Sequence, residues 1–121
     1  MYCPSLFRED RPEVQHAFIR SHPLGLLISH GSTGLLANLL PFVLKTGDSQ
    51  RGVLQAHMAR ANPQWRQVES NNRVLVLFTG ANHYISPNWY ESKREHGKVV
   101  PTWNYTAVHA VGTARLFVDP T

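Results

Sequence analysis

The sequence predicts a mainly β domain with short helices, in which successive antiparallel hairpins close into a barrel. Three observations support this prediction: short apolar runs of strand length, turns rich in Gly, Asn and Asp between them, and one helical stretch of useful length. The chain has 121 residues, of which 42% are hydrophobic and 17% are charged. This length and composition fit a single globular domain over residues 1–121.

The first third of the chain predicts a helix followed by a hairpin. Asp10 before a proline is typical of a helix start, with the acid as cap, and the apolar spacing continues the helix over 12–21. The apolar run 24–30 predicts a strand, and a tight turn leads back into a second strand over 35–45. Because Pro41 lies inside that second strand, we expect an edge, a bulge or an open side there.

The middle of the chain predicts a third strand that runs into a short helix. Residues 52–57 form the strand and residues 62–68 form the helix. Asn62 is a good N-cap, and Pro63 suits the first helical position, where its missing N–H costs nothing. The turn between the two elements therefore has free backbone N–H groups and the positive end of a helix dipole.

This strand-to-helix turn also contains a cation. Arg60 lies next to the free N–H groups, and together they form a small anion cradle suited to a phosphate. The alternative is an ordinary helix start with a solvated arginine, because most turns of this kind bind nothing.

The last part of the chain predicts two longer strands. Residues 73–79 are apolar on both faces, which favours a central strand. Residues 107–118 form a long strand, with Gly112 at a bulge or bend. Between these strands we expect a loop at 80–82, an extended piece at 83–87, one helical turn at 88–91 and an exposed loop at 93–97.

Charge and composition exclude several classes of function. The net charge is +4, and the basic residues are scattered; the densest cluster, Lys93, Arg94 and Lys98, alternates with acids and reads as a solvated face. No helix-turn-helix is visible, whereas a mild positive charge suits anionic small ligands. Cys3 stands alone, and the seven histidines show no zinc spacing, so we expect neither a disulfide framework nor a metal site.

The sequence also shows no assembled catalytic machinery. It contains no nucleophile elbow and no standard Gly-rich phosphate loop, so we name no catalytic residue. No signal peptide and no apolar run of membrane-spanning length is visible, and we expect a cytoplasmic protein. A set of aromatics lies around loops and strand ends and suits either core and interface packing or stacking on a flat heteroaromatic ligand: Trp65, Tyr84, Trp89, Tyr90, Trp103 and Tyr105.

Four ordered segments resemble a known family. Residues 56–65, Ala-His-Met-Ala-Arg-Ala-Asn-Pro-Gln-Trp, are similar to the GHLARANPQW signature of PaiB-type FMN-binding negative transcriptional regulators. The segments 38–42, 83–90 and 99–109 agree in the same order, and the start of the chain also fits. The resemblance covers nearly the whole chain.

The resemblance implies a specific fold and function. It implies an antiparallel split β-barrel of the pyridoxamine-phosphate-oxidase-like kind, and a homodimer with FMN at the subunit interface. It implies a cytoplasmic repressor, in the best-known case of sporulation and degradative-enzyme genes. We expect a regulator rather than an enzyme, with DNA as a partner on the strength of the family name alone. The alternatives are a flavin-dependent oxidoreductase or flavin reductase on the same barrel, and a dimeric interaction module with a vestigial flavin site.

The resemblance also implies cofactor-binding residues. The second-strand segment lines the flavin ring, and the strand-to-helix turn holds the phosphate. A partner subunit covers the ring with Tyr84 or Trp103. By position, the remaining residues are Asn38, Leu39, Leu40, Pro41 and Phe42 for the ring and His57, Ala59, Arg60 and Asn62 for the phosphate.

Family members usually continue beyond the point where this sequence stops. We therefore expect the domain to lack the C-terminal segment of the family, which carries a further strand and a basic, polar tail. Barrel closure, full dimer contact and flavin retention would depend on that segment.

Overall fold

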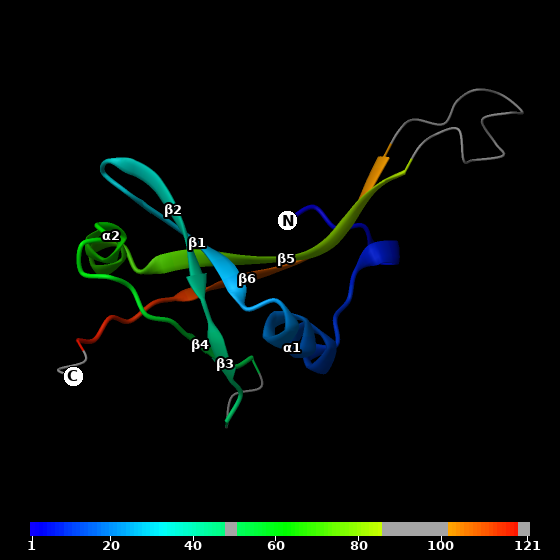
Figure 1. Ribbon diagram of the computed structural model, residues 1–121, viewed down its shortest axis with the longest axis horizontal. Helices are drawn as coiled ribbons and strands as arrows, with labels where there is room; N and C mark the ends of the chain where they lie inside the picture. The colour runs from blue at the N-terminus through cyan, green and yellow to red at the C-terminus, as the bar shows by residue number, and fades with distance from the viewer. Residues whose placement is uncertain (48–50, 86–101, 119–121) are drawn as a thin grey trace, which may run out of the picture.

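A computed structural model describes residues 1–47, 51–85 and 102–118 (Figure 1). It confirms a mainly β fold with antiparallel strands and short helices. In chain order the elements are a 3-10 turn at Ser5–Phe7, α1 at Pro12–Ser21, β1 at Leu24–Gly31, β2 at Gly34–Pro41, β3 at Val43–Lys45, β4 at Val53–Gln55, α2 at Gln64–Ser70, β5 at Arg73–Ile85 and β6 at Thr102–Thr113.

Hydrogen bonding divides the described strands into two sheets. One has four strands in the order β2-β1-β5-β6, and the other is a two-stranded ribbon of β3 and β4. We had expected a single barrel-like sheet, and the difference arises where the predicted second strand breaks into β2 and β3. Pro41 has no N–H to donate, the N–H of Phe42 makes a last bond in the β1–β2 register to the carbonyl of Pro23 at 2.8 Å, and from Val43 the chain pairs with β4 instead. The expected irregularity at Pro41 is therefore confirmed.

The core packs around this break. The side chain of Phe42 is buried against the fully buried Phe78, with ring centroids 5.7 Å apart and an edge-on angle of 75°. Gly25 leaves room for this pair, because a Cβ there would lie 2.8 Å from the Phe78 ring and 3.0 Å from the Phe42 ring. The other buried hydrophobic residues are Ile19, Leu27, Leu44, Val68 and Val76.

Helix α1 has the predicted bounds, but its start differs from the prediction. The cap position is Arg11, and no side chain caps the helix. Asp10 instead accepts a hydrogen bond from Nε of Arg8 at 2.7 Å, so the predicted capping by this acid is wrong. Helix α2 likewise begins at Gln64 rather than at residue 62.

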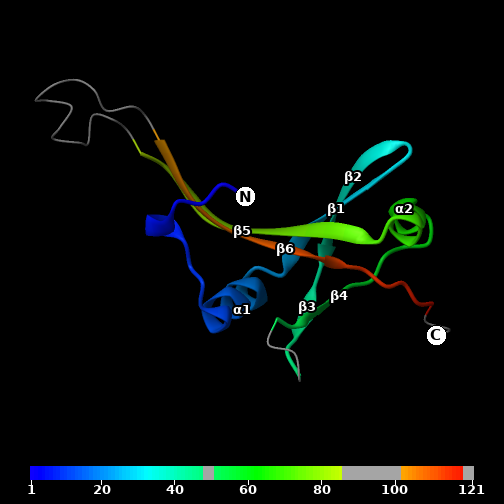
Figure 2. The same ribbon diagram turned by 180° about the vertical axis from the view of Figure 1, so that it is seen from behind.

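Strands β5 and β6 form a long hairpin that extends as an arm from the body of the molecule (Figure 2). The predicted loop at 80–82 is wrong, because β5 continues through it with a register shift between Thr79 and Asn82. The bulge lies here and not at Gly112, which pairs regularly with Val74. Gly80 is required by close packing, since a Cβ there would lie 2.5 Å from Oγ1 of Thr106 and 2.9 Å from the Phe18 ring of α1.

Other boundaries also differ from the prediction: β4 ends at Gln55 rather than at residue 57, and α2 ends at Ser70 rather than at residue 68. β6 begins at Thr102 and ends at Thr113, whereas the sequence predicted a strand over 107–118. The predicted helical turn at 88–91 and loop at 93–97 lie outside the described residues. Within the described ranges, no helix is long and apolar enough to cross a membrane.

Candidate ligand site at the turn before α2

The turn that joins β4 to α2 offers a run of free backbone donors. Only the N–H of Asn62 is used, and it donates to the carbonyl of Ala59 at 3.0 Å. Among the described residues, the N–H groups of residues 57–61 find no hydrogen-bond acceptor. Apart from the half-buried Met58, these residues are exposed. The turn can therefore bind an anion through its backbone.

Asn62 holds the turn against the start of the helix. Its Oδ1 accepts the N–H of Gln64 at 3.0 Å, and Pro63 occupies the cap position in helical conformation, with φ −69° and ψ −9°. Pro63 is thus one position earlier relative to the helix than predicted. Asn62 nevertheless satisfies an N–H group at the helix start, which is what the sequence pattern required of it.

The side chain of Arg60 is available, whereas its backbone is fixed. The residue is exposed, and within the described part of the chain its guanidinium makes no ion pair or hydrogen bond. Its carbonyl oxygen accepts a hydrogen bond from Nε1 of Trp65 at 2.9 Å. The guanidinium of Arg66 lies over the Trp65 ring at 5.2 Å from its centroid. A free cation thus lies next to the free N–H groups, on a backbone held by α2.

Behind the turn lies a buried amide that the sequence analysis did not identify. Gln64 is fully buried. Its Nε2 donates to the carbonyls of Leu27 at 2.9 Å and Leu36 at 3.2 Å, and its Oε1 accepts Nδ2 of Asn38 at 2.9 Å. The same Nδ2 lies 3.4 Å from Oδ1 of Asn62. The structure therefore brings together two predicted site residues, Asn38 and Asn62, through a residue that was not predicted.

A second glutamine, one helical turn further on, completes this network. Nε2 of Gln67 donates to the carbonyl of Gly34 at 3.0 Å, and its Oε1 accepts the buried hydroxyl of Ser29. Ser29 also accepts Nε2 of Gln64 at 3.1 Å. Sequence reasoning missed these residues because glutamine and serine are usually exposed. The available signal was the spacing of the two glutamines, which places both on one face of a helix.

The other ring-lining candidates divide by exposure. Leu39 is 60% exposed, and Pro41 is also exposed, so both present apolar side chains at the surface of β2. Leu40 is half-buried and packs against the core, and Phe42 lies within it. On this segment Asn38 is therefore half-buried on the face of β2 that meets α2, whereas Leu39 and Pro41 are exposed on the opposite face.

Tyr84 and Trp103 lie elsewhere in the chain. They are cross-strand partners on the arm, with ring centroids 5.7 Å apart, and Nε1 of Trp103 donates to Oδ1 of Asn82 at 3.1 Å. Both views of the ribbon place the arm at the opposite end of the molecule from α2 (Figures 1 and 2). Within one chain, the structure does not bring these aromatics to the turn.

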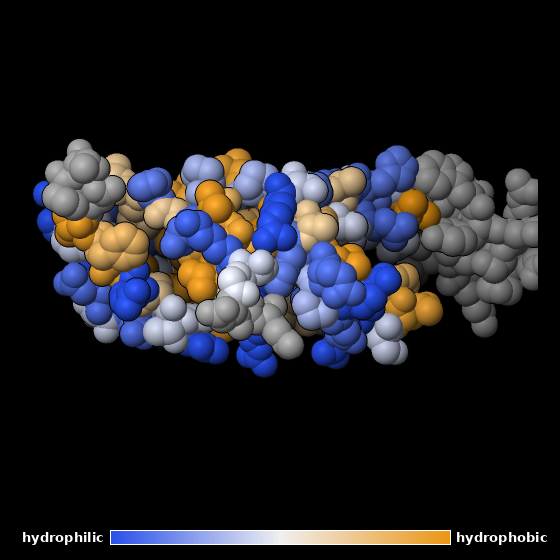
Figure 3. Space-filling view, turned by 90° about the horizontal axis from the view of Figure 1, so that it is seen from below, coloured by the Kyte–Doolittle hydropathy of each residue, from blue (hydrophilic) through white to orange (hydrophobic). Residues whose placement is uncertain are grey.

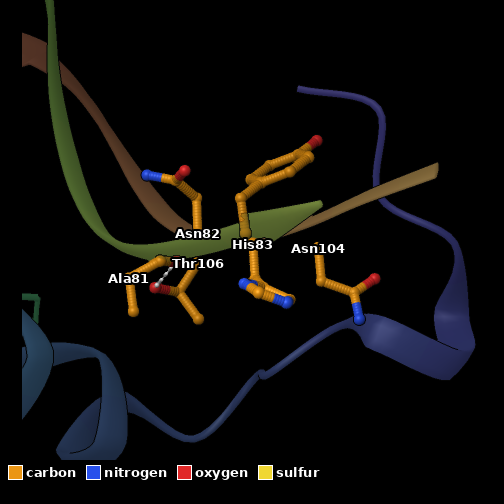
Figure 4. Close-up of a pocket in the computed structure, with 6 residues that line it drawn as sticks. Ala81, Asn82, His83, Asn104 and Thr106 are labelled. Carbon is orange, nitrogen blue, oxygen red and sulfur yellow. Dashed lines mark hydrogen bonds between the residues drawn. The ribbon is translucent and has the colours of Figure 1, made fainter. Parts of the chain in front are cut away.

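A hollow of about 230 Å³ lies at the bulge of the arm (Figure 4). His83 and Asn104 project to one side of the strands and Asn82 to the other, while Oγ1 of Thr106 donates to the carbonyl of Ala81 at 3.3 Å. The hollow contains none of the predicted site residues, so the turn at 57–62 remains the better candidate for the ligand site. The lining residues are Ala81, Asn82, His83, Asn104, Tyr105 and Thr106.

Among the histidines that the structure describes, His109 has a shifted pKa, and it lies away from the turn. Burial lowers the pKa of His109, and the positive charge of the N-terminal amine lowers it further. This residue is half-buried in β6, opposite Leu77 of β5. His109 is therefore favoured in its neutral form as part of the sheet.

Comparison with known proteins identifies the family of the chain. Residues 1–121 match the family described as "Putative FMN-binding domain". The chain belongs to this family. The match confirms the resemblance found in the sequence.

Relatives of this chain occur in bacteria and fungi. It is 36% identical to the protease synthase and sporulation protein PAI 2 of Bacillus subtilis, over 96% of this chain and 53% of the relative. It is 35% identical to an uncharacterized protein of Emericella nidulans, over 98% of this chain and 58% of the relative. An uncharacterized protein of Saccharomyces cerevisiae is 32% identical, over 98% of this chain and 80% of the relative. The chain thus spans between about half and four-fifths of the length of these relatives.

The residues of the turn fit the phosphate of FMN. A phosphate dianion needs several N–H donors and a cation, and residues 56–63 supply both without an acidic side chain. Asn38, on the face of β2 that meets α2, contacts the turn, whereas Leu39 and Pro41 present apolar side chains on the opposite face of the strand. The donor set of the turn therefore matches the phosphate end of the cofactor.

Proposed function

We propose that the chain binds FMN, with the phosphate on the turn at 57–62 and the ring along β2. The observation that carries this proposal is the run of unused N–H groups beside the free guanidinium of Arg60, in a chain of this family. Ala59 and Ala61 leave the phosphate oxygens room to approach the backbone. When bound, FMN supplies a planar, redox-active ring, and the chain supplies its position and its anion-binding groups.

We propose that the site is completed by a second subunit. Tyr84, Trp103 and Tyr105 are 42%, 54% and 62% exposed in a single chain, which is unusual for large aromatics with no partner surface. The lower face of the molecule, which carries α1 and the β3–β4 ribbon, also shows hydrophobic side chains among polar ones (Figure 3). In a homodimer, Tyr84 or Trp103 from the arm of one subunit would cover the flavin ring held by the other.

The biological role that we propose is an FMN-binding negative regulator of transcription in the cytoplasm. Its support is the PaiB-type resemblance, together with 36% identity to a protein named for protease synthesis and sporulation. A net charge of +4 is compatible with a DNA partner. DNA contact would then come from the dimer surface rather than from a recognition helix.

The first test is whether the purified protein is yellow and quenches FMN fluorescence on titration. Retardation of promoter DNA in an electrophoretic shift assay would support the regulator. Bleaching of the bound flavin by NADH or NADPH, without DNA binding, would indicate that the protein is a flavin-dependent oxidoreductase and not a regulator. A parent protein that binds no FMN at saturating concentration would remove the proposed function altogether.

A further inference from the structure

We infer that Gln64 is a positioning residue that couples the two halves of the FMN site, the turn at 57–62 and the edge strand β2. This inference rests on the proposed function. Gln64 is fully buried, which leaves its side chain inaccessible to a ligand at the surface. Its role would be to fix the distance and orientation between one segment that binds the phosphate and another that binds the ring.

The orientation of the Gln64 amide is determined by the backbone around it. One end faces the carbonyl oxygens of Leu27 and Leu36, which can only accept hydrogen bonds, so that end is the Nε2 donor. The other end is then Oε1, an acceptor, and it faces the side chain of Asn38 at 2.9 Å. Asn38 must therefore turn its own Nδ2 toward Gln64.

The orientation of the Asn62 amide is determined independently, by the backbone N–H of Gln64. The backbone N–H of Gln64 can only donate, so the Asn62 atom 3.0 Å from it must be Oδ1. The same Oδ1 faces Nδ2 of Asn38 at 3.4 Å, which agrees with the polarity set by the two carbonyls. The three amides thus have a single consistent arrangement, from the strand carbonyls to the turn.

This arrangement matters because side chains link the turn and its helix to β2, and the other amide that does so, that of Gln67, reaches only the Gly34 carbonyl at the start of the strand. β2 is an edge strand that pairs with β1 alone, and β4 pairs with β3. Among the described residues, no backbone hydrogen bond joins residues 34–41 to residues 56–63. The link is made by side chains, and Gln64 is the one that bonds both to a β2 carbonyl and to Asn38.

A coupling residue has a signature that differs from that of a contact residue. A ligand that spans two subsites gains affinity from their fixed spacing, whereas each of its fragments binds only one subsite. Loosening the spacing should therefore weaken FMN and leave riboflavin, which lacks the phosphate, and inorganic phosphate nearly unaffected. Loss of a direct contact would weaken the fragment concerned as well.

The experiment compares Gln64→Met with Gln67→Met. Both variants remove a hydrogen-bonding amide from the same face of α2, but Gln67 bonds to Ser29 and Gly34 and contacts neither Asn38 nor Asn62. We expect Gln64→Met to bind FMN about tenfold more weakly, with the affinities for riboflavin and phosphate changed less than about twofold. Gln67→Met should keep the affinity of the parent for all three ligands, and thermal unfolding establishes that each variant is folded.

The outcomes separate this inference from the proposed function. If the parent binds FMN and Gln64→Met binds it equally well, or loses riboflavin in proportion, the coupling role is wrong and the FMN site stands. If the parent binds no FMN, both fall together. Should Gln64→Met not fold, Gln64→Asn keeps an amide that is one methylene too short to bond both to the Leu36 carbonyl and to Asn38. A loss of riboflavin affinity in that variant would overturn the inference, and a loss confined to FMN would support it.

Discussion

Trp65 donates its indole N–H to the backbone carbonyl of Arg60, five residues earlier, over 2.9 Å. The first turn of α2 therefore holds the backbone of the loop that precedes it. Because the N–H groups of that loop are otherwise unused, this hydrogen bond helps to keep them in one arrangement for an anion. A pre-organised set of donors binds more tightly than a mobile one, since less conformational entropy is lost.

Replacing Trp65 by Phe tests the role of this hydrogen bond. The variant keeps an aromatic ring for the guanidinium of Arg66 but has no N–H to donate. We expect a loss of about 1 kcal/mol in the free energy of unfolding, typical of one hydrogen bond, and an FMN affinity several-fold lower. Urea unfolding and FMN titration measure the two effects. If the variant is less stable but binds FMN with unchanged affinity, the hydrogen bond from Trp65 to Arg60 contributes to folding and not to FMN binding.

Arg60→Ala should weaken FMN by about ten- to a hundredfold, because a charge-assisted hydrogen bond to phosphate is lost. Arg60→Lys should fall between the two, since lysine keeps the charge without the planar fork. Arg66→Ala is the matched control: its side chain lies over Trp65, and it should matter little. Fluorescence quenching measures all three, and equal affinities for Arg60→Ala and the parent would remove Arg60 from the site.

Asn62→Asp separates folding from binding at a single position. An aspartate oxygen can still accept the N–H of Gln64 and favours a helix start, so stability should be kept or raised. Its negative charge beside the phosphate should nevertheless lower FMN affinity at least tenfold and leave riboflavin unaffected. Asn72→Asp, just beyond the other end of α2, controls for the change in net charge. If Asn62→Asp binds FMN like the parent, the phosphate does not lie on this turn.

His109 predicts how stability depends on pH. Its pKa is lowered by burial and by the N-terminal charge, so the folded state takes up a proton less readily than the unfolded chain, whose histidine pKa is about 6.5. The stability linked to neutral His109 is fully present above that value and is lost as the pH falls below it. Urea unfolding at several pH values should show this decline. His109→Gln should flatten it, and an identical slope in that variant would contradict the assignment.

Trp103→Lys should shift the protein from dimer to monomer and weaken FMN with it. The side chain is 54% exposed on the arm in a single chain, and a charge in the middle of an interface opposes association. Leu35→Lys, at an exposed position on the β1–β2 hairpin, makes the same change in charge away from the arm. Light scattering measures the mass of both variants. A parent protein that is monomeric at high concentration would rule out the dimer.

The elements that sequence patterns predicted well are those governed by local rules. The bounds of α1 follow from apolar spacing and a proline at the start, and β1 follows from a continuous apolar run. The interruption at Pro41 was also predictable, because a proline cannot donate in a ladder. The free N–H groups of the turn followed in the same way from a strand ending at a helix start.

The features that were missed depend on contacts distant in sequence. The residues at 80–82 have the composition of a loop, yet pairing with β6 keeps them in β5 and places the irregularity there. Gln64 looks like a surface residue on a short helix, and only the assembled sheet shows that its amide lies among strand carbonyls. No local pattern specifies either of these outcomes. The cap of α1 was missed for a local reason, because Arg8, two residues before Asp10, pairs with the acid that was expected to cap the helix.

The bulge at Gly80 lies at the base of the arm, where a small change in geometry alters the direction of the whole hairpin. The Phe18 ring of α1 lies where a larger residue at position 80 would project, so the angle at which the arm leaves the body is set at its root by the helix. A small change of angle there displaces Tyr84 and Trp103, further along the same hairpin, by a much larger distance. Substitutions at the contact between α1 and the bulge would thus move Tyr84 and Trp103 without altering either residue, and in the proposed homodimer they would change how the two copies meet.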